Sequence, residues 1–226
     1  MFFGPFLFIY ALLFLALLVL VFIPLALGLI KHAFEVIGLP PDLAFAALIV
    51  TLLGSYVNIP LRRLHGGRIE PRTLIDSFGV RYRVPRLLYE GPRSTLLAVN
   101  VGGAVVPVLL CAYALWHMPS AWMASVIGVA LVSVVVHAVA RPVRGLGIAT
   151  PLFLPPLAAV VAAYLLAPPA ATSVVAYVSG VLGTLIGADL ANLGRVSDLG
   201  APVVSIGGAG TFDGIFLTGI VAVLLS

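Results

Sequence analysis

The stretch from Ser205 to Phe216, SIGGAGTFDGIF, places Asp213 behind three glycines and next to the last apolar segment of the chain. An ionised aspartate costs about 2.5–3.5 kcal/mol at the centre of a membrane helix, so a carboxylate at that depth indicates a functional site. The rest of the sequence decides whether Asp213 lies in a membrane, and which groups lie beside it.

The composition is typical of an integral membrane protein. Of the 226 residues, 62% are hydrophobic and only 9% are charged, which leaves too few polar side chains to cover a water-soluble domain. Long continuous apolar runs, without alternating strands, favour spanning helices over a barrel. We therefore expect an all-α, polytopic membrane protein that forms one integral domain over residues 1–226.

The apolar runs predict about seven transmembrane helices, because each run approaches the roughly 20 residues that a crossing helix needs. They cover residues 6–30, 43–60, 95–115, 121–140, 151–167, 173–193 and 202–225. In the last run the glycines predict a break near Gly207, Gly208 and Gly210, with a half-helix that begins around Thr211. The same Gly-Gly-Ala pattern interrupts NVGGAVVP, residues 100–107, and such segments allow close helix packing.

The arginines predict the orientation. Segments 61–94, 141–150 and 194–201 alternate between the runs and hold every arginine, whereas Lys31 falls on the other side. Because basic loops stay in the cytoplasm, we expect the N-terminus inside, the C-terminus outside, and a location in the cytoplasmic membrane. The basic loop at 61–94 is then expected to bind anionic lipid head groups and no nucleic acid. Within it GVRYRV, residues 79–84, has the alternation of a short strand.

In this topology the polar side chains within the apolar runs gather in the cytoplasmic half of the membrane. They are Asn58, Asn100, His137, Asp189, Asn192 and Asp213. Asp189 lies at the end of the sixth run and Asp213 about a dozen residues into the seventh, which is antiparallel to it, so we expect the two aspartates to approach each other. Two neighbouring carboxylates in a low dielectric share one proton and can act as general base and general acid on water. The other four residues are expected to support this pair.

Three functions remain open on these residues. A membrane-embedded hydrolase, most directly a peptidase that cleaves a transmembrane peptide, would use Asp189 and Asp213 as catalytic groups. A proton- or cation-coupled transporter or channel for a small solute would use the same aspartates to bind a proton or ion. In a scaffold, they would only cap helices. No set of His, Cys and carboxylate residues has zinc spacing, so we expect no metal and no cofactor.

Three segments resemble one family. NVGGAVVPV (100–108), LGTLIGADLANL (182–193) and SIGGAGTFDGIFLTGIVAVLL (205–225) are similar to the signature of an uncharacterised prokaryotic membrane family, domain of unknown function 1614. The resemblance covers most of the chain beyond residue 40. It implies membership and a multi-pass membrane location, and it implies no activity.

A second resemblance is to the presenilin and signal-peptide-peptidase group of intramembrane aspartyl proteases. GTFDGIF, residues 210–216, is similar to the motif of that group around its second aspartate, and Asp189 and Asp213 have the matching chain directions. The chain departs from the group at Phe212, which stands where a glycine precedes the aspartate. It also has GAD at residues 187–189 in place of Tyr-Asp, and its PPL at residues 155–157 comes before both aspartates. The resemblance implies that these two aspartates are catalytic.

Overall fold

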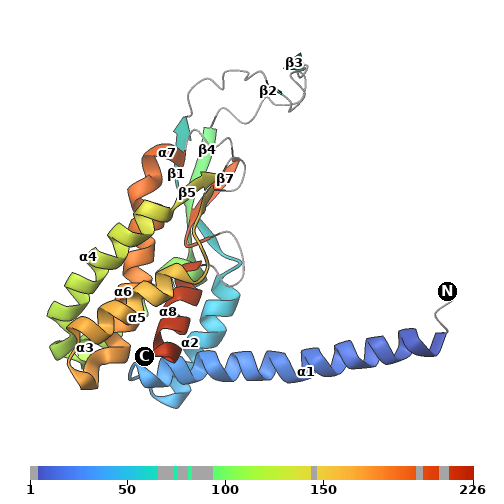
Figure 1. Ribbon diagram of the computed structural model, residues 1–226, viewed down its shortest axis with the longest axis horizontal. Coiled ribbons are helices and arrows are strands. Elements are labelled where there is room, and N and C mark those ends of the chain that lie inside the picture. Colours follow the sequence, from blue (N-terminus) through green and yellow to red (C-terminus); the bar gives the residue numbers. More distant parts are fainter. Residues whose placement is uncertain are drawn as a thin grey trace.

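The computed structural model describes residues 5–65, 74–75, 81–82, 94–143, 147–196, 201–208 and 214–226. These residues are mostly helical, as the composition predicts, and a small sheet lies at one end of the helices (Figure 1). The helices are α1 (Pro5–Val36), α2 (Pro41–Gly54), α3 (Val106–His117), α4 (Trp122–Val139), α5 (Leu154–Leu166), α6 (Thr172–Thr184), α7 (Leu193–Val196) and α8 (Gly214–Leu225).

Five short helical turns join or extend these helices. Two are π-helices, η1 (Val101–Val105) before α3 and η4 (Leu185–Asp189) after α6. The other three are 3-10 turns, η2 (Pro119–Ala121), η3 (Pro169–Ala171) and η5 (Leu190–Asn192). Because π-turns are rare and frequently lie at functional sites, η1 and η4 are places to look for such a site.

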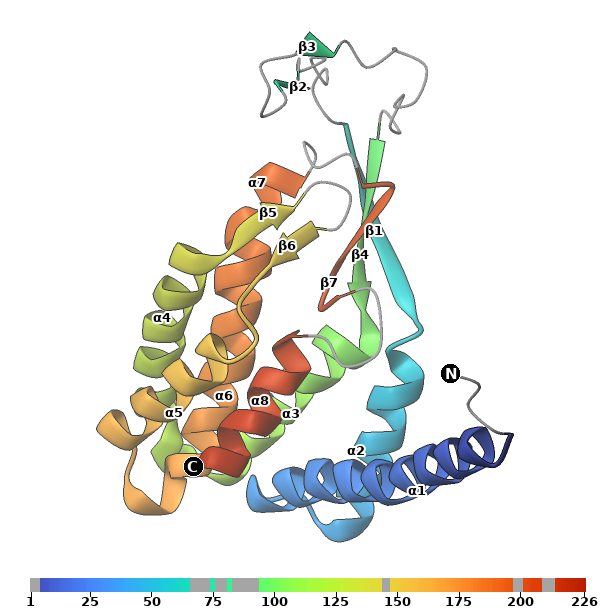
Figure 2. The ribbon, with the colours of Figure 1, turned by 45° about the vertical axis from the view of Figure 1, so that its right-hand side comes forward.

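The main sheet has three strands in the order β1, β4, β7. β1 (Asn58–His65) pairs antiparallel with β4 (Ser94–Asn100), and β4 pairs in parallel with β7 (Val203–Ile206). Two small hairpins complete the described strands: β2 (Leu74–Ile75) with β3 (Arg81–Tyr82), and β5 (Arg141–Val143) with β6 (Gly147–Ala149). Figure 2 shows how the sheet is connected to two of the helices: β1 continues from the end of α2, and β4 leads into η1 and α3.

The sheet corrects the expectation of seven continuous helices and of an all-α fold. The runs at 43–60, 95–115 and 202–225 each contain a strand as well as a helix, so Asn58 begins β1 and Asn100 ends β4. Among its described residues, the last run is interrupted at Gly207 and Gly208, with strand β7 before the interruption and α8 after it. The strand expected within 79–84 is present as β3.

Two helical segments of the described chain are long and apolar enough to cross a membrane by length and composition. They are Pro119–Val139 and Pro169–Val196, and shorter apolar helices accompany them. The prediction of seven spans with a defined orientation is therefore not supported at that level of detail.

α4 and α6 run side by side in the same direction. They approach each other closely because glycines leave no side chains between them. A Cβ atom on Gly128 would lie 2.2 Å from Ser179 Oγ, and one on Gly183 would lie 2.6 Å from Val132 Cβ. One more turn along, a Cβ on Gly187 would lie 2.5 Å from Ser133 O. This close approach carries the end of α6 and η4 along the last turns of α4.

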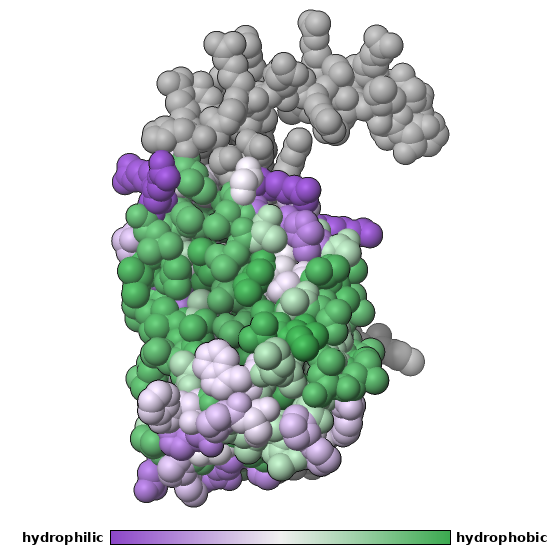
Figure 3. Space-filling model, turned by 90° about the vertical axis from the view of Figure 1, so that its left-hand side faces the viewer, coloured by the Kyte–Doolittle hydropathy of each residue, from purple (hydrophilic) through white to green (hydrophobic). Residues whose placement is uncertain are grey.

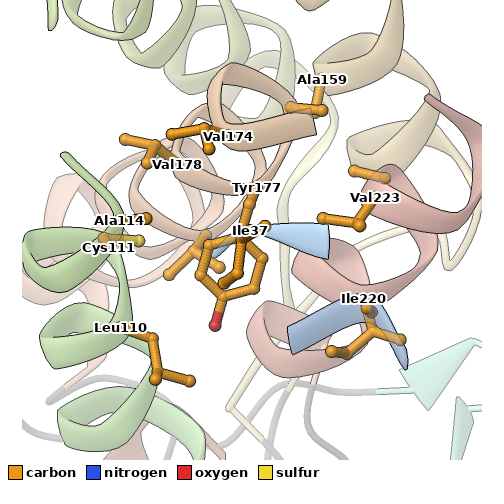
Figure 4. Packing of buried hydrophobic residues seen from close by; sticks show 14 of the residues in the cluster. Ile37, Leu110, Cys111, Ala114, Ala159, Val174, Tyr177, Val178, Ile220 and Val223 are labelled. Atoms are coloured by element: carbon orange, nitrogen blue, oxygen red, sulfur yellow. The ribbon is translucent and has the colours of Figure 1, made fainter. Parts of the chain in front are cut away.

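The core lies where α6 meets α3, α5 and α8. Tyr177 of α6 is 1% exposed, and Figure 4 shows it between Leu110 and Cys111 of α3 and Ile220 of α8. The end of α1 joins this core through Phe34, whose ring centroid lies 6.3 Å from that of Phe216 in an edge-to-face arrangement. Burial of these side chains holds the helices beneath the sheet.

Because Gly128 packs against Ser179, we predict that substitutions at these two positions have non-additive effects on stability. Gly128→Ala should destabilise the protein by about 1–3 kcal/mol, because the new methyl group overlaps the Ser179 hydroxyl. Ser179→Ala alone should be neutral or stabilising, since that hydroxyl has no hydrogen-bond partner among the described residues. The double variant should recover part of the loss in a thermal unfolding series, and purely additive effects would contradict the contact.

Candidate functional site

The two parallel strands β4 and β7 end at the same edge of the sheet, and the predicted asparagines meet there. Asn100 is fully buried, at 0% exposure. Its amide nitrogen donates to Ser55 O at 2.7 Å and to Asn58 Oδ1 at 3.1 Å, and its Oδ1 accepts from Gly103 N at 2.7 Å. Asn100 therefore ties the end of α2, the start of β1 and the π-turn η1 together.

Asn58 joins this group to β7. Its Oδ1 also accepts from the hydroxyl of Ser205 at 2.6 Å, so one oxygen takes two hydrogen bonds. That arrangement assigns the orientation of the Asn58 amide, because only the oxygen can accept from two donors. The NH2 group of Asn58 therefore faces away from Asn100 and Ser205, on a residue that is exposed.

The glycine turn after β7 lies against η1. Gly207 and Gly208 have φ values of +82° and +79°, which side-chain-bearing residues rarely adopt. A Cβ on Gly103 would lie 2.0 Å from Gly207 O, so the two glycine pairs identified in the sequence are in direct contact. The two Gly-Gly-Ala segments predicted close packing of helices, whereas the close contact observed is between a π-turn and a strand end.

Asp189 reaches the same turn from the end of η4. Its Oδ2 accepts a hydrogen bond from Gly207 N at 2.9 Å, and the residue is half-buried. The carboxylate is therefore placed at the end of the sheet, at the first of the two left-handed glycines. Gly210, Thr211 and Asp213 lie outside the described residues, and α8 begins at Gly214, the residue after Asp213.

The two remaining predicted residues, His137 and Asn192, form a separate group on the α4 side of η4. Asn192 is 1% exposed and donates to Ala188 O at 2.9 Å and to Gly187 O at 3.2 Å. His137 Nδ1 lies 3.3 Å from Gly187 O and 3.4 Å from Asn192 Nδ2. Asn192 also accepts from Arg195 Nη1 at 3.2 Å. This group holds the end of η4 and does not contact the asparagines of the sheet through any described hydrogen bond.

Sequence reasoning missed Ser205, Ser55 and Gly103 as members of the site. A serine in an apolar run gives no periodic signal, and the Ser55 contribution is a backbone carbonyl that any residue could supply. The repeated Gly-Gly-Ala pattern does point to Gly103, but the pattern does not reveal that Gly103 packs against Gly207. The junction that these residues complete consists of Ser55, Asn58, Asn100, Gly103, Asp189, Ser205 and Gly207.

The family described as a protein of unknown function (DUF1614) matches residues 52–225, a stretch that contains every residue of the junction. No curated protein and no solved structure matches the chain.

Proposed function

Because the chain belongs to DUF1614, a family of unknown function, its activity has to be inferred from the junction, and we propose that it is a membrane-embedded aspartyl hydrolase. The substrate class is a transmembrane peptide, and the catalytic groups are Asp189 and Asp213. The observation that carries the proposal is the Asp189 carboxylate at the end of β7, bonded to Gly207 N at 2.9 Å.

The surface supports the membrane part of this proposal. α4 belongs to an apolar segment of which only 28% is buried, so most of its hydrophobic side chains face outward. A core helix of a soluble protein would be mostly buried, whereas lipid accommodates this surface. Figure 3 shows a broad hydrophobic band between two more hydrophilic ends.

The residue types exposed at the two ends of the helices also differ, with aromatic side chains at one end and arginines at the other, as in membrane proteins. Trp116 and Trp122 are exposed where α3 ends and α4 begins, and Tyr164 is exposed near the end of α5. Such side chains favour the interface between lipid and water. At the other end lie the arginines whose side chains the structure describes, which are Arg62, Arg63, Arg141 and Arg195. We infer that the sheet and the junction face the cytoplasm of a prokaryotic cell.

The proposed chemistry divides one reaction between two carboxyl groups. The ionised carboxylate takes a proton from water as the water attacks the peptide carbonyl, and the protonated carboxyl group donates its proton to the carbonyl oxygen. Collapse of the resulting diol transfers a proton to the leaving nitrogen and breaks the carbon–nitrogen bond. Gly207 N bonds one oxygen of Asp189, which orients the carboxylate.

β7 offers a place for the substrate. β4 occupies one edge of β7, and within the described sheet no strand pairs with the other edge. Val203 at its start is 46% exposed. An extended peptide that pairs with this edge would gain main-chain hydrogen bonds and would run toward Gly207 and Asp189.

The direct test of the hydrolase is cleavage of a transmembrane reporter peptide by the full-length protein in liposomes. Mass spectrometry should find two fragments that together contain one added water, and Asp213→Asn should abolish them. Wild-type protein that produces no fragments from a library of transmembrane peptides would contradict the proposal.

A specific observation favours proton- or cation-coupled transport as a second candidate. Five hydroxyl groups on α4 and α6 have no hydrogen-bond partner among the described residues, namely those of Ser125, Ser133, Tyr177, Ser179 and Thr184. A dry unpartnered hydroxyl costs about 1–3 kcal/mol, so water or a cation would stabilise these groups. Flux in proteoliposomes that requires Asp189, without peptide cleavage, would select this function.

A further inference from the structure

An arginine near the junction is held in place by a buried side chain. Arg195 is exposed on α7, and its Nη1 donates to Asn192 Oδ1 at 3.2 Å. Asn192 is 1% exposed and bonds the carbonyls of Ala188 and Gly187 in η4. One of the five N–H groups of Arg195 is thus tied to the backbone through Asn192, and the rest of the planar fork is presented outward in a restricted orientation.

A second basic group lies at the adjoining end of α4. Gly187 has no side chain, and α4 approaches it so closely that a Cβ there would lie 3.0 Å from Val136 Cβ. His137 follows on α4, with its Nδ1 3.3 Å from Gly187 O. The exposed Arg141 begins β5 just after α4 ends, and Figures 1 and 2 both place β5 beside α7.

These arginines lack a protein counter-charge among the described residues. The one ion pair of the described chain joins Lys31 and Glu35, on α1. The Asp189 carboxylate turns to Gly207 on the sheet side of η4. A ligand at Arg195 and Arg141 would therefore be an anion.

The surface beside these arginines is apolar. On α4, Leu131 is 48% exposed and Val134 is 70% exposed, and beside Asn192 the side chain of Leu190 is 41% exposed. In Figure 3 the hydrophobic band of this face reaches strongly hydrophilic residues at one end. A ligand with an anionic head and long apolar chains matches both parts of this surface.

We propose that Arg195, with Arg141 and His137 beside it, binds the phosphodiester of an anionic phospholipid whose acyl chains lie along α4. Arginine holds phosphate through two parallel charge-assisted hydrogen bonds, and the bond to Asn192 leaves its fork available for them. The inference rests on the membrane location within the proposed function and not on hydrolysis, so protein without peptidase activity can still confirm it.

Native mass spectrometry of the full-length protein in detergent tests this site, with phosphatidylglycerol, phosphatidylcholine and inorganic phosphate as probes. We expect the wild type to bind phosphatidylglycerol about tenfold more tightly than phosphatidylcholine, and Arg195→Gln to remove that preference. Arg62→Gln is the matched control, since Arg62 is exposed on β1 without a buried anchor. Asn192→Ala retains the charge and should weaken binding less than Arg195→Gln does.

Three results would overturn the proposal. Arg195→Gln could bind phosphatidylglycerol as the wild type does, or Arg62→Gln could lower binding by the same factor, which would indicate unspecific attraction to charge. Inorganic phosphate could displace the lipid at comparable concentration, which would assign the site to free phosphate. If thermal unfolding shows that Arg195→Gln is not folded, Arg195→Lys replaces it, and a loss of at least threefold is expected because lysine cannot bind in the bidentate manner.

Discussion

Replacing Asp189 by asparagine is expected to reduce reporter-peptide hydrolysis by about 10³-fold or more while the protein stays folded. Asparagine has the same shape, and its Oδ1 can still accept the hydrogen bond from Gly207 N that Oδ2 of Asp189 accepts at 2.9 Å. What it loses is the ability to take a proton from water. The rate of fragment formation and the unfolding temperature should therefore respond differently to this one change.

Asp42→Asn is the matched control for Asp189→Asn. Asp42 is exposed in the first turn of α2, and its change should leave both activity and stability within experimental error. Full activity in Asp189→Asn would mean that the carboxylate only accepts the Gly207 amide and has no chemical role. A large fall in the unfolding temperature of Asp189→Asn would also favour a structural role, because it would show that the charge of Asp189 stabilises the fold.

Replacing Gly103 by alanine is expected to disrupt the junction. The new Cβ would lie 2.0 Å from Gly207 O and 3.0 Å from Gly207 C, and these are backbone atoms that no side-chain rotation can move away. β7 would have to separate from η1, and the Gly207 N–H that bonds Asp189 would move with it. We expect a loss of about 1–3 kcal/mol or more in the free energy of unfolding, equivalent to roughly 2–4 °C in unfolding temperature per kcal/mol.

Gly194→Ala provides the comparison for Gly103→Ala. Nothing lies within 4 Å of a Cβ on Gly194, so the same chemical change in α7 should have little effect or should stabilise the helix. Thermal unfolding and hydrogen exchange of the amides in β4 and β7 would measure both variants. Equal stability of the two variants would show that η1 and β7 are not packed as described.

The polar residues of the junction were largely predictable as a set, but their arrangement was not. Asn58 and Asn100 stand out in the sequence because asparagine is rare in apolar runs. That they lie opposite each other follows from the register of β1 and β4, in which Asn58 pairs with Asn100. Their distance along the chain gives no hint of this, since the pairing depends on strands that the hydropathy pattern assigns to helices.

Composition and glycine positions are enough to predict that the chain is mostly helical, that it is rich in apolar side chains, and that its glycines permit close backbone contacts. These properties follow from side-chain transfer free energies and from the absence of Cβ atoms, which are local quantities. That residues 95–100 and 203–206 are strands is visible only in the folded chain. A strand satisfies its backbone hydrogen bonds only on a partner strand, so its existence depends on which distant segments meet. That meeting places Asp189 against Gly207 at the end of the sheet.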